Sequence, residues 1–379
     1  MKILYNLEAT QPASGSKIHG GGNYGIVVFF ELLKYDVEIE CLVNSDKFLR
    51  EDIVSALAEK GIKTYDTTST DISELLANNK YDAFYSALTV AGVTIPERTR
   101  FIGTEHGLRE LEMPNDWMML RYKSSFKNRL KFIITALMGK RWKKVLRNRK
   151  RARLLNPKFE YVAVSEHTKY AILSNIPEID PKRIQVFYSP APEIDPATVV
   201  PYSNEKYVFL VSGNRPEKNV LRAVKAIDEL ISEYPQFNGL KVIIAGATKR
   251  SFRHKYANPD NFVFPGYVDE STLQSMYKGA MMFVYPSLNE GFGYPPIEAM
   301  NYGVPVLASP VTSIAEVCGD AALYFNPFDY KEIKGRVLRM LLSEETRAEY
   351  SHRGFKRYAE VSSRQKEDLK KMVEFIIGK

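Results

Sequence analysis

The chain of 379 residues is too long for one ordinary hydrophobic core and suits two domains of similar size. Its two cysteines, Cys41 and Cys318, exclude a disulfide framework and predict ordinary buried thiols in a reducing compartment. A secretory signal is not expected, and no apolar stretch reaches the ~20 residues that span a bilayer. We therefore expect a cytoplasmic protein, with a net charge of +8.

The first half alternates short apolar runs with helical patterns. Helices are expected from about Tyr24 and over residues 47–59. The strands expected in this half are residues 2–7, 37–43, 83–87, 100–104, 161–164 and 184–188. This alternation predicts an α/β domain with a parallel sheet that helices cover on both faces.

A proline-rich segment, residues 189–196, breaks any regular element and marks the expected linker. A second series of strands and helices follows it, and the tail from residue 343 is expected to be mainly helical. The strands expected in this half are residues 207–211, 241–245, 262–264, 282–285, 304–308 and 322–325. We predict two doubly wound domains, residues 1–195 and 203–357.

The stretch from Ser287 to Met300 combines two carboxylates with two glycines and a helix start. Gly291 and Gly293 allow the backbone to turn sharply and to approach a ligand closely. Pro295 suits the first position of a helix, whose N-terminal amides favour an anion such as a diphosphate. Glu290 in the loop and Glu298 in the first helical turn are suited to accept hydrogen bonds from sugar hydroxyls. The pattern predicts a sugar-nucleotide site, although either glutamate alone is more simply explained as an ordinary acid.

This stretch resembles the motif of the family-4 glycosyltransferases of the GT-B fold, written E-G-F-G-x-P-x-x-E-A, and every fixed position of that motif is present. The resemblance extends over about residues 205–330. It implies two Rossmann-like domains that face a central cleft, with the last helix, residues 358–379, packing back on the first domain. It also implies that the enzyme retains the anomeric configuration of the transferred sugar.

The resemblance assigns a role to each part of the motif. Glu298 is expected to bind the donor ribose, and Glu290 the hydroxyls of the transferred sugar. The amides of Gly291, Phe292 and Gly293 are expected to stabilise the charge that develops on the leaving diphosphate.

Arg215 and Lys218 lie between a strand and a helix, where two cations suit a diphosphate; a pair of surface bases beside a turn is the plainer alternative. In the resembled family a basic pair in this loop stabilises the departing nucleoside diphosphate. No D-x-D sequence occurs in the chain, and its His, Cys and acidic residues show no metal-ligand spacing. We therefore expect no metal and no cofactor, with cations and backbone amides in place of Mg²⁺ or Mn²⁺.

Three further sites come from weaker signals. Gly21 and Gly22 belong to a glycine-rich loop, His19 to Gly25, that the resemblance places near the donor phosphates; a flexible connector is the alternative. His106 follows a strand, at a position where members of the resembled family often have a histidine that contacts the transferred sugar. The alternative is a neutral histidine that satisfies local backbone groups. Nearby acids such as Glu105 are best explained as solvated. Tyr267 and Val268 match the turn that holds the nucleobase.

Residues 121–153 contain 14 Lys or Arg and no acidic residue, whereas the rest of the chain carries a net charge of −6. Apolar residues, among them Phe132, Ile133 and Leu137, interleave with these bases and give the segment amphipathic character. Such a segment is able to lie on an anionic membrane, or to pack its apolar face on its own domain. We expect no nucleic-acid binding, since no nucleic-acid module accompanies the bases.

Together these features predict a metal-independent retaining glycosyltransferase that moves a hexose-type sugar from a nucleotide sugar to a glycan or lipid-linked acceptor. Synthesis of a surface polysaccharide or glycoconjugate, with the protein peripheral on the inner face of the plasma membrane, is the expected context. The alternatives are a non-catalytic protein that binds nucleotide sugars or glycans, and a phosphorylase or epimerase on the same fold.

Overall fold

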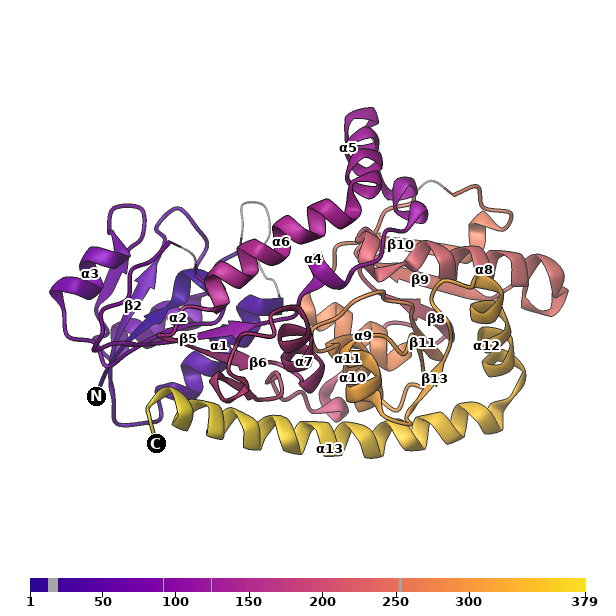
Figure 1. Cartoon of the computed structure of the whole chain (residues 1–379). Helices are drawn as coiled ribbons and strands as arrows, with labels where there is room; N and C mark the ends of the chain where they lie inside the picture. The colour runs from indigo at the N-terminus through magenta and orange to yellow at the C-terminus, as the bar shows by residue number, and fades with distance from the viewer. Residues whose placement is uncertain (13–19, 91, 124, 252–253) are drawn as a thin grey trace. The chain divides into compact units, whose positions relative to one another are not determined.

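A computed structural model describes residues 1–12, 20–90, 92–123, 125–251 and 254–379 (Figure 1). The chain divides into two compact units. Unit 1 comprises Met1–Leu108, Arg147–Glu193 and Ser362–Lys379, and unit 2 comprises Arg109–Leu146 and Ile194–Val361. Cys41, in unit 1, and Cys318, in unit 2, are buried free thiols, as predicted.

Unit 1 is built on a parallel sheet of seven strands in the order β3-β2-β1-β4-β5-β6-β7. Its strands are β1 (Lys2–Asn6), β2 (Glu38–Val43), β3 (Thr64–Asp66), β4 (Ala83–Ser86), β5 (Arg100–Glu105), β6 (Phe159–Ala163) and β7 (Ile184–Val186). All but β3 were predicted from apolar runs. The sequence of β3, Thr-Tyr-Asp, is short and none of its residues is buried, so it lacks the apolar run that identifies the inner strands.

The helices of unit 1 are α1 (Gly20–Leu32), α2 (Glu51–Glu59), α3 (Ile72–Asn78) and α7 (Glu166–Asn175). Gly25 of α1 lies against the short 3-10 helix Leu7–Thr10 and the residue after β4, because a Cβ atom added there would be 2.7 Å from Thr10 Cγ2 and 2.8 Å from Ala87 Cβ. The predicted glycine loop is wrong in one respect: Gly21 and Gly22 already belong to α1. His19 lies outside the described residues.

Unit 2 contains a parallel sheet of six strands in the order β10-β9-β8-β11-β12-β13. Its strands are β8 (Tyr207–Leu210), β9 (Lys241–Ala245), β10 (Phe262–Gly266), β11 (Met282–Tyr285), β12 (Val306–Ala308) and β13 (Ala322–Tyr324). Its helices include α8 (Val220–Glu233), α9 (Glu270–Gly279), α10 (Tyr294–Asn301), α11 (Ser313–Cys318) and α12 (Tyr330–Leu342).

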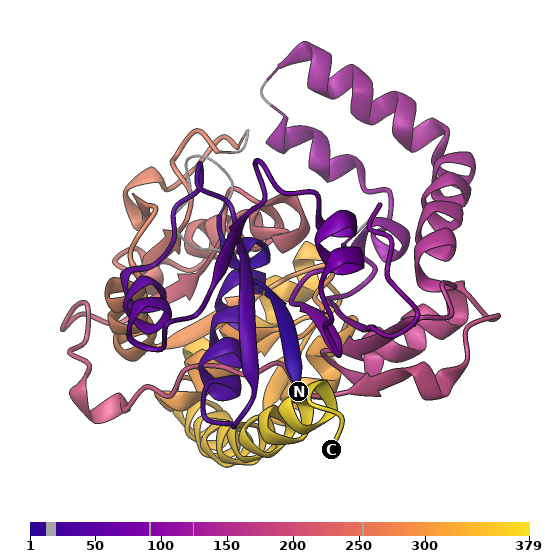
Figure 2. The same ribbon diagram turned by 90° about the vertical axis from the view of Figure 1, so that its left-hand side faces the viewer.

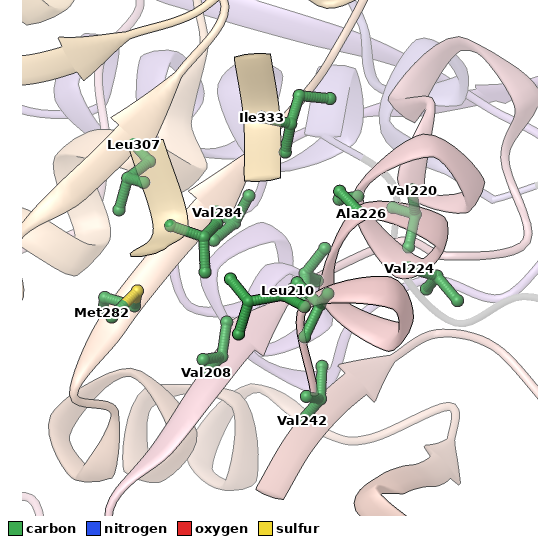
Figure 3. Close-up of a cluster of buried hydrophobic side chains, with 14 of the residues drawn as sticks. Val208, Leu210, Val220, Val224, Ala226, Val242, Met282, Val284, Leu307 and Ile333 are labelled. Atoms are coloured by element: carbon green, nitrogen blue, oxygen red, sulfur yellow. The ribbon is translucent and has the colours of Figure 1, made fainter. Parts of the chain in front are cut away.

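The core of unit 2 lies between this sheet and helices α8 and α12 (Figure 3). Val208 and Leu210 of β8 and Val242 of β9 are fully buried on the side that α8 covers. Val220 and Val224 of α8 project into the same cluster. Apolar residues recur along α8 at helical spacing, so one face of the helix is buried against the sheet. This packing sets the position of the helix and of its first residue.

The strand order places a topological switch between β8 and β11. The chain builds outward from β8 to β9 and β10, and then returns to build from β11 to β12 and β13 on the other side. In open α/β sheets ligands bind at such a switch, beyond the carboxyl ends of the strands. The loops after β8 and β11 are therefore where a ligand site is expected.

The segment 109–146 groups with unit 2, whereas the sequence-based boundaries placed it in the first domain. It contains α4 (Arg109–Glu112), α5 (Phe126–Leu137) and the first half of α6 (Gly139–Leu154). Asp116 forms a two-pronged ion pair with Arg222 of α8, at 2.6 and 2.8 Å. The backbone N–H of Leu221 also donates to the hydroxyl of Tyr122, at 2.9 Å. These contacts join residues that are far apart in the sequence, so no local sequence pattern predicts them.

The last helix, α13 (Glu344–Ile376), is one continuous helix whose end belongs to unit 1 (Figure 1). There the Asp368 carboxylate accepts a hydrogen bond from the backbone N–H of Tyr188, at 2.8 Å. The Tyr24 hydroxyl donates to the sulfur of Met372, at 2.9 Å. The two chain ends, both in unit 1, lie near each other in both views (Figures 1 and 2).

Candidate functional site

A buried ion pair joins the loops that follow β8 and β11. Lys218, at the end of the short 3-10 helix Pro216–Lys218, places its Nζ 2.6 Å from Oε1 of Glu290. The two side chains are only 7% and 10% exposed. The structure thus brings together two predicted site residues that are 72 positions apart in the sequence.

Two hydroxyl groups complete the surroundings of Glu290. The hydroxyl of Tyr285 donates to Oε1 of Glu290 at 2.6 Å and accepts from Nζ of Lys218 at 2.8 Å. The hydroxyl of Ser287 donates to the same carboxylate oxygen. Burial by itself raises the pKa of the Glu290 carboxyl, but the Lys218 ammonium and these two hydroxyls outweigh burial and hold that pKa below its usual value. Glu290 is therefore an ionised, firmly positioned carboxylate.

The two loops are also joined through their backbones. The N–H of Leu288 donates to the carbonyl of Glu217, at 2.8 Å. The side-chain amide of Asn219 donates to the carbonyls of Pro286 and Pro327, at 3.0 and 2.7 Å. These bonds fix the distance between the Lys218 and Glu290 backbones, so the ion pair is held in place by more than its own attraction.

Unusual backbone conformations cluster at this end of the sheet. Among the described residues, the non-glycine residues with positive φ are Ser212, Asn219 and Thr312, at 54°, 55° and 51°. All three follow strands of unit 2 at their carboxyl ends. The Thr312 hydroxyl accepts from the N–H of Glu290, at 2.9 Å. Strained backbone of this kind concentrates at functional sites, where surrounding bonds hold it.

The glycines of the motif shape the entry to α10. Gly293 has a φ of 100° and is the residue directly before the helix, a conformation that a residue with a side chain adopts only with strain. The hydroxyl of Ser313 donates to the carbonyls of Glu290 and Phe292, at 3.1 and 2.9 Å, so those carbonyls face α11. Pro295 lies in the first two positions of α10, which leaves the amides at the helix start suited to an anion.

Glu298 is the fifth residue of α10 and not part of its first turn, which corrects the sequence-based placement. Its side chain is half-buried. Burial, followed by repulsion from the Glu270 carboxylate, raises the pKa of Glu298 to about 7, although a hydrogen bond from Tyr277 opposes the rise. A carboxyl with a raised pKa beside the candidate site is the kind of group that functional sites contain.

Arg215, which was predicted to face a diphosphate, pairs with an acid of the same loop in the structure. Its guanidinium is about half exposed and pairs with the Glu217 carboxylate, at 2.6 Å. Arg109 of α4 pairs with the same carboxylate, at 3.0 Å. Glu217 therefore holds two cations beside the Lys218–Glu290 pair. The sequence analysis missed Arg109, Glu217, Tyr285 and Ser287, although each lies within five residues of a predicted site residue.

Of the predicted site residues in unit 1, His106 contacts a backbone carbonyl and an aromatic ring. Nε2 of His106 lies 2.8 Å from the carbonyl of Ala87, and because a carbonyl only accepts, Nε2 carries the proton. The Tyr24 ring meets the His106 ring edge-on, with centroids 4.8 Å apart. This bond agrees with the alternative interpretation of His106 as a neutral histidine that satisfies backbone groups. The contact to the transferred sugar stays a prediction. Glu105 is not a solvated acid as predicted, because it is 3% exposed and pairs with Lys150 and Arg153 of α6.

Tyr267 and Val268 follow β10, the strand at one edge of the sheet. Tyr267 is 74% exposed. Strands β9 and β8 lie between β10 and β11 in the sheet, so this turn is not part of the Lys218–Glu290 group. In the parts of the chain that the structure describes, no group of three or more His, Cys, Asp or Glu is placed to hold a metal ion.

A comparison with protein families identifies a family that this region of the chain resembles. Residues 193–357 match the family model described as glycosyl transferases group 1. That region contains Lys218, Glu290 and Glu298 together with all six strands of the second sheet. This part of the chain is therefore similar to the glycosyl transferases group 1 family.

Curated relatives match over part of their length. The serotype-specific mannosyltransferase WbdA of Escherichia coli is 32% identical over 147 residues, which are 37% of this chain and 18% of WbdA. The O-antigen chain mannosyltransferase RfbU of Salmonella typhimurium is 28% identical over 183 residues, which are 47% of this chain and 50% of RfbU. The matched region thus spans at most half the length of these two relatives.

Solved structures resemble the chain over its whole length. The structure titled WaaG, a glycosyltransferase involved in lipopolysaccharide biosynthesis, matches with a TM-score of 0.68 at 13% identity and full coverage of both chains. Anabaena HepE, in complex with UDP and glucose, matches with a TM-score of 0.61 at 14% identity, again with full coverage. Together with the two parallel sheets, these matches confirm the GT-B fold.

The buried ion pair makes a prediction about stability. Lys218→Met leaves the Glu290 carboxylate buried without its cation, so we expect the free energy of unfolding to fall by about 3–5 kcal/mol. The double variant Lys218→Met/Glu290→Gln removes the stranded charge and should recover part of that loss. Urea unfolding measures both, with the exposed Lys249→Met as the matched control. Equal stability of the single variant and the control would contradict the assignment.

Glu298 makes a prediction about pH. Its pKa is raised to about 7 in the folded protein, from an ordinary value of 4.5. Between those values the folded state holds a proton that the unfolded state has lost, so this group's contribution to stability falls as the pH rises. Glu298→Gln cannot ionise, and its melting temperature relative to the natural protein should rise from pH 4.5 to pH 8. A difference that does not change with pH, or one matched by the exposed Glu59→Gln, would remove the assignment.

Proposed function

We propose that the protein is a retaining, metal-independent glycosyltransferase that moves a hexose-type sugar from a nucleotide sugar to a glycan or lipid-linked acceptor. The observation that carries the proposal is the buried Lys218–Glu290 pair at the switch between β8 and β11, inside the region that matches glycosyl transferases group 1. The two mannosyltransferase relatives make a nucleotide-activated mannose the first donor to test.

Lys218 is proposed to stabilise the leaving diphosphate. Its ammonium is neutralised by Glu290 in the structure, so a bound diphosphate has to compete for it. Arg215 and Arg109, both held by Glu217, supply further positive charge beside the same loop. With the amides at the start of α10, these groups stabilise charge without a metal, an electrostatic contribution that is usually among the largest in catalysis.

Glu290 is proposed to bind hydroxyls of the transferred sugar, not to attack it. Its Oε1 already accepts from Lys218, Tyr285 and Ser287, and an oxygen with three donors is a poor nucleophile. We therefore favour attack by the acceptor on the same face as the leaving phosphate, which retains the configuration. Glu298 is proposed to bind the ribose. His106, Gly21 and Gly22 of unit 1, with Tyr267 and Val268 of unit 2, remain proposed contacts to the sugar, the phosphates and the base.

The proposed setting is the cytoplasmic synthesis of a surface polysaccharide or glycoconjugate. WbdA and RfbU carry names that refer to serotype and O-antigen, which supports this class of product. We propose that the protein is peripheral on the inner face of the plasma membrane, where a lipid-linked acceptor is found. None of the helices in the described parts of the chain is both long enough and apolar enough to cross a bilayer.

Transfer from a panel of nucleotide sugars tests the proposed reaction. We expect turnover with a nucleotide-activated hexose, and we expect turnover to survive EDTA because cationic side chains and amides stabilise the diphosphate. Retention is checked from the anomeric configuration of the product. Loss of activity on chelation that Mn²⁺ or Mg²⁺ restores would refute metal independence. Tight binding without any turnover would instead indicate a binding protein.

Calorimetry with two ligands separates the roles of the glutamates. Glu298→Gln should weaken a nucleoside diphosphate and its sugar ester alike, because both contain the ribose. Glu290→Gln should weaken only the sugar ester, and it frees Lys218, so binding of the free diphosphate should stay equal or become tighter. Each lost charged hydrogen bond should cost about 1.5–3 kcal/mol.

The isosteric Gln substitutions keep side-chain volume, and unfolding curves serve as the control for structural damage. If both variants weaken both ligands equally, the division of roles between Glu290 and Glu298 is wrong. If neither variant affects either ligand, the donor site lies elsewhere.

A further inference from the structure

Helix α5 leaves its apolar side chains uncovered. None of its twelve residues, all of which the structure describes, is buried. Four apolar residues follow one another at spacings of four, four and three, which places them on one face of the helix. They are Phe126, Leu130, Ile134 and Leu137, with exposed fractions of 81%, 46%, 48% and 76%, and we call them the α5 stripe.

Both tryptophans of the chain lie in the same segment of unit 2 as this stripe, residues 109–146. Trp142, at the start of α6, is 46% exposed, and it is flanked at helical spacing by Met138 and Val145, which are also exposed. Trp117 is 56% exposed, and its ring lies 6.1 Å from that of Phe132 of α5, measured between centroids. Exposed large apolar side chains thus gather in this one segment, and such accumulations mark interaction surfaces.

This finding decides one of the alternatives that the sequence left open. The α5 stripe is exposed, so this part of the segment's apolar surface does not pack on its own domain. It also changes the residues expected to insert, because Phe132 and Ile133 are half-buried whereas Phe126, Leu130 and Ile134 are exposed.

The charges around the stripe determine what is able to cover it. Residues 121–153 carry 14 basic and no acidic side chains, and Lys127 and Lys131 of α5 and Lys140 of α6 are exposed. A second copy of the chain would bring like charges together, which disfavours self-association. An anionic bilayer offers opposite charge and an apolar interior within one surface, and amphipathic helices of this composition lie in that interface.

Hydrogen bonds and an ion pair hold helix α5 and the start of α6 to unit 2. Asn115 donates to the carbonyl of Ala136 at 3.2 Å, and Lys143 donates to the carbonyl of Met113 at 3.0 Å. The neighbouring Asp116 is ion-paired with Arg222 of α8, at 2.6 Å. Figures 1 and 2 show α5 projecting away from the sheet of unit 2. Docking of α5 would therefore place the donor-binding sheet at a defined distance from the membrane.

We propose that the α5 stripe inserts shallowly into an anionic lipid bilayer, with the surrounding lysines and arginines contacting the headgroups. This inference deepens, and rests on, the membrane association proposed above, since it names the helix that inserts. It requires neither a particular donor nor a particular acceptor.

Intrinsic fluorescence reports on the segment that carries this stripe, because Trp117 and Trp142 are the only tryptophans in the chain and both lie in that segment. With the full chain and vesicles of phosphatidylcholine and phosphatidylglycerol, we expect a blue shift in emission and quenching by lipids brominated on their acyl chains. Vesicles of phosphatidylcholine alone should give neither effect. Co-sedimentation with the same vesicles should match the fluorescence.

The variant Phe126→Gln/Leu130→Gln/Leu137→Gln should lower vesicle partitioning about tenfold or more, because it removes apolar contact. Since α5 has no buried residue, this variant should fold, and circular dichroism checks that it does. The matched control is Val200→Gln/Leu342→Gln, which changes residues of unit 2 that are 75% and 62% exposed away from α5. The control should partition like the natural protein.

Three results would overturn the inference. The first is no binding to anionic vesicles at low salt. The second is binding that salt reverses, without quenching and without any effect of the triple variant, which would indicate adsorption by charge alone. The third is light scattering that shows self-association of the natural chain, abolished by the triple variant, which would make a second copy the occupant. Because vesicle binding is measured without donor or acceptor, each of these results leaves the proposed transferase reaction to its own tests.

Discussion

The arrangement of unit 2 depends on one constraint, the burial of two opposite charges at the meeting point of β8 and β11. Removing Lys218 and Glu290 from water carries a desolvation cost, which their attraction offsets only with good geometry and additional hydrogen bonds. Tyr285 and Ser287 supply those bonds, and the backbone bond between Leu288 and Glu217 fixes the loops. A pair that is held this firmly before any ligand arrives is preorganised, which is what electrostatic stabilisation of a leaving group requires.

The same region anchors the part of the chain that carries the exposed helix. Asn219 holds Pro286 and Pro327 through its amide, and its side-chain oxygen accepts from Arg222, at 2.7 Å. Arg222 in turn binds Asp116, which begins the approach to α5. The loop that holds the candidate donor site and the support of the α5 stripe therefore share one chain of polar contacts within unit 2.

The comparisons divide in a way that this geometry explains. The family match is confined to residues 193–357, whereas similarity to solved structures covers the whole chain at 13% and 14% identity. A site that needs particular side chains at particular loop positions constrains the sequence around it. A sheet needs only apolar residues at the right spacing, which many sequences provide. Both units thus share a fold with these solved structures, and the second also matches a family model.

The sequence by itself determined most of the secondary structure and the centre of the site. Twelve of the thirteen strands in the described parts of the chain were predicted, because buried parallel strands are continuous apolar runs. Glu290 and Glu298 were singled out because their spacing with two glycines is a local pattern. Only the tertiary structure decided which charges meet: Lys218 with Glu290, Arg215 with Glu217, and Glu105 with two bases of α6. Periodicity likewise predicted an apolar face on α5, but not that the face is uncovered. Ion pairs, and the packing that covers an apolar face, join residues that are far apart in the chain. Both therefore depend on how the helices and strands pack and not on any local sequence pattern.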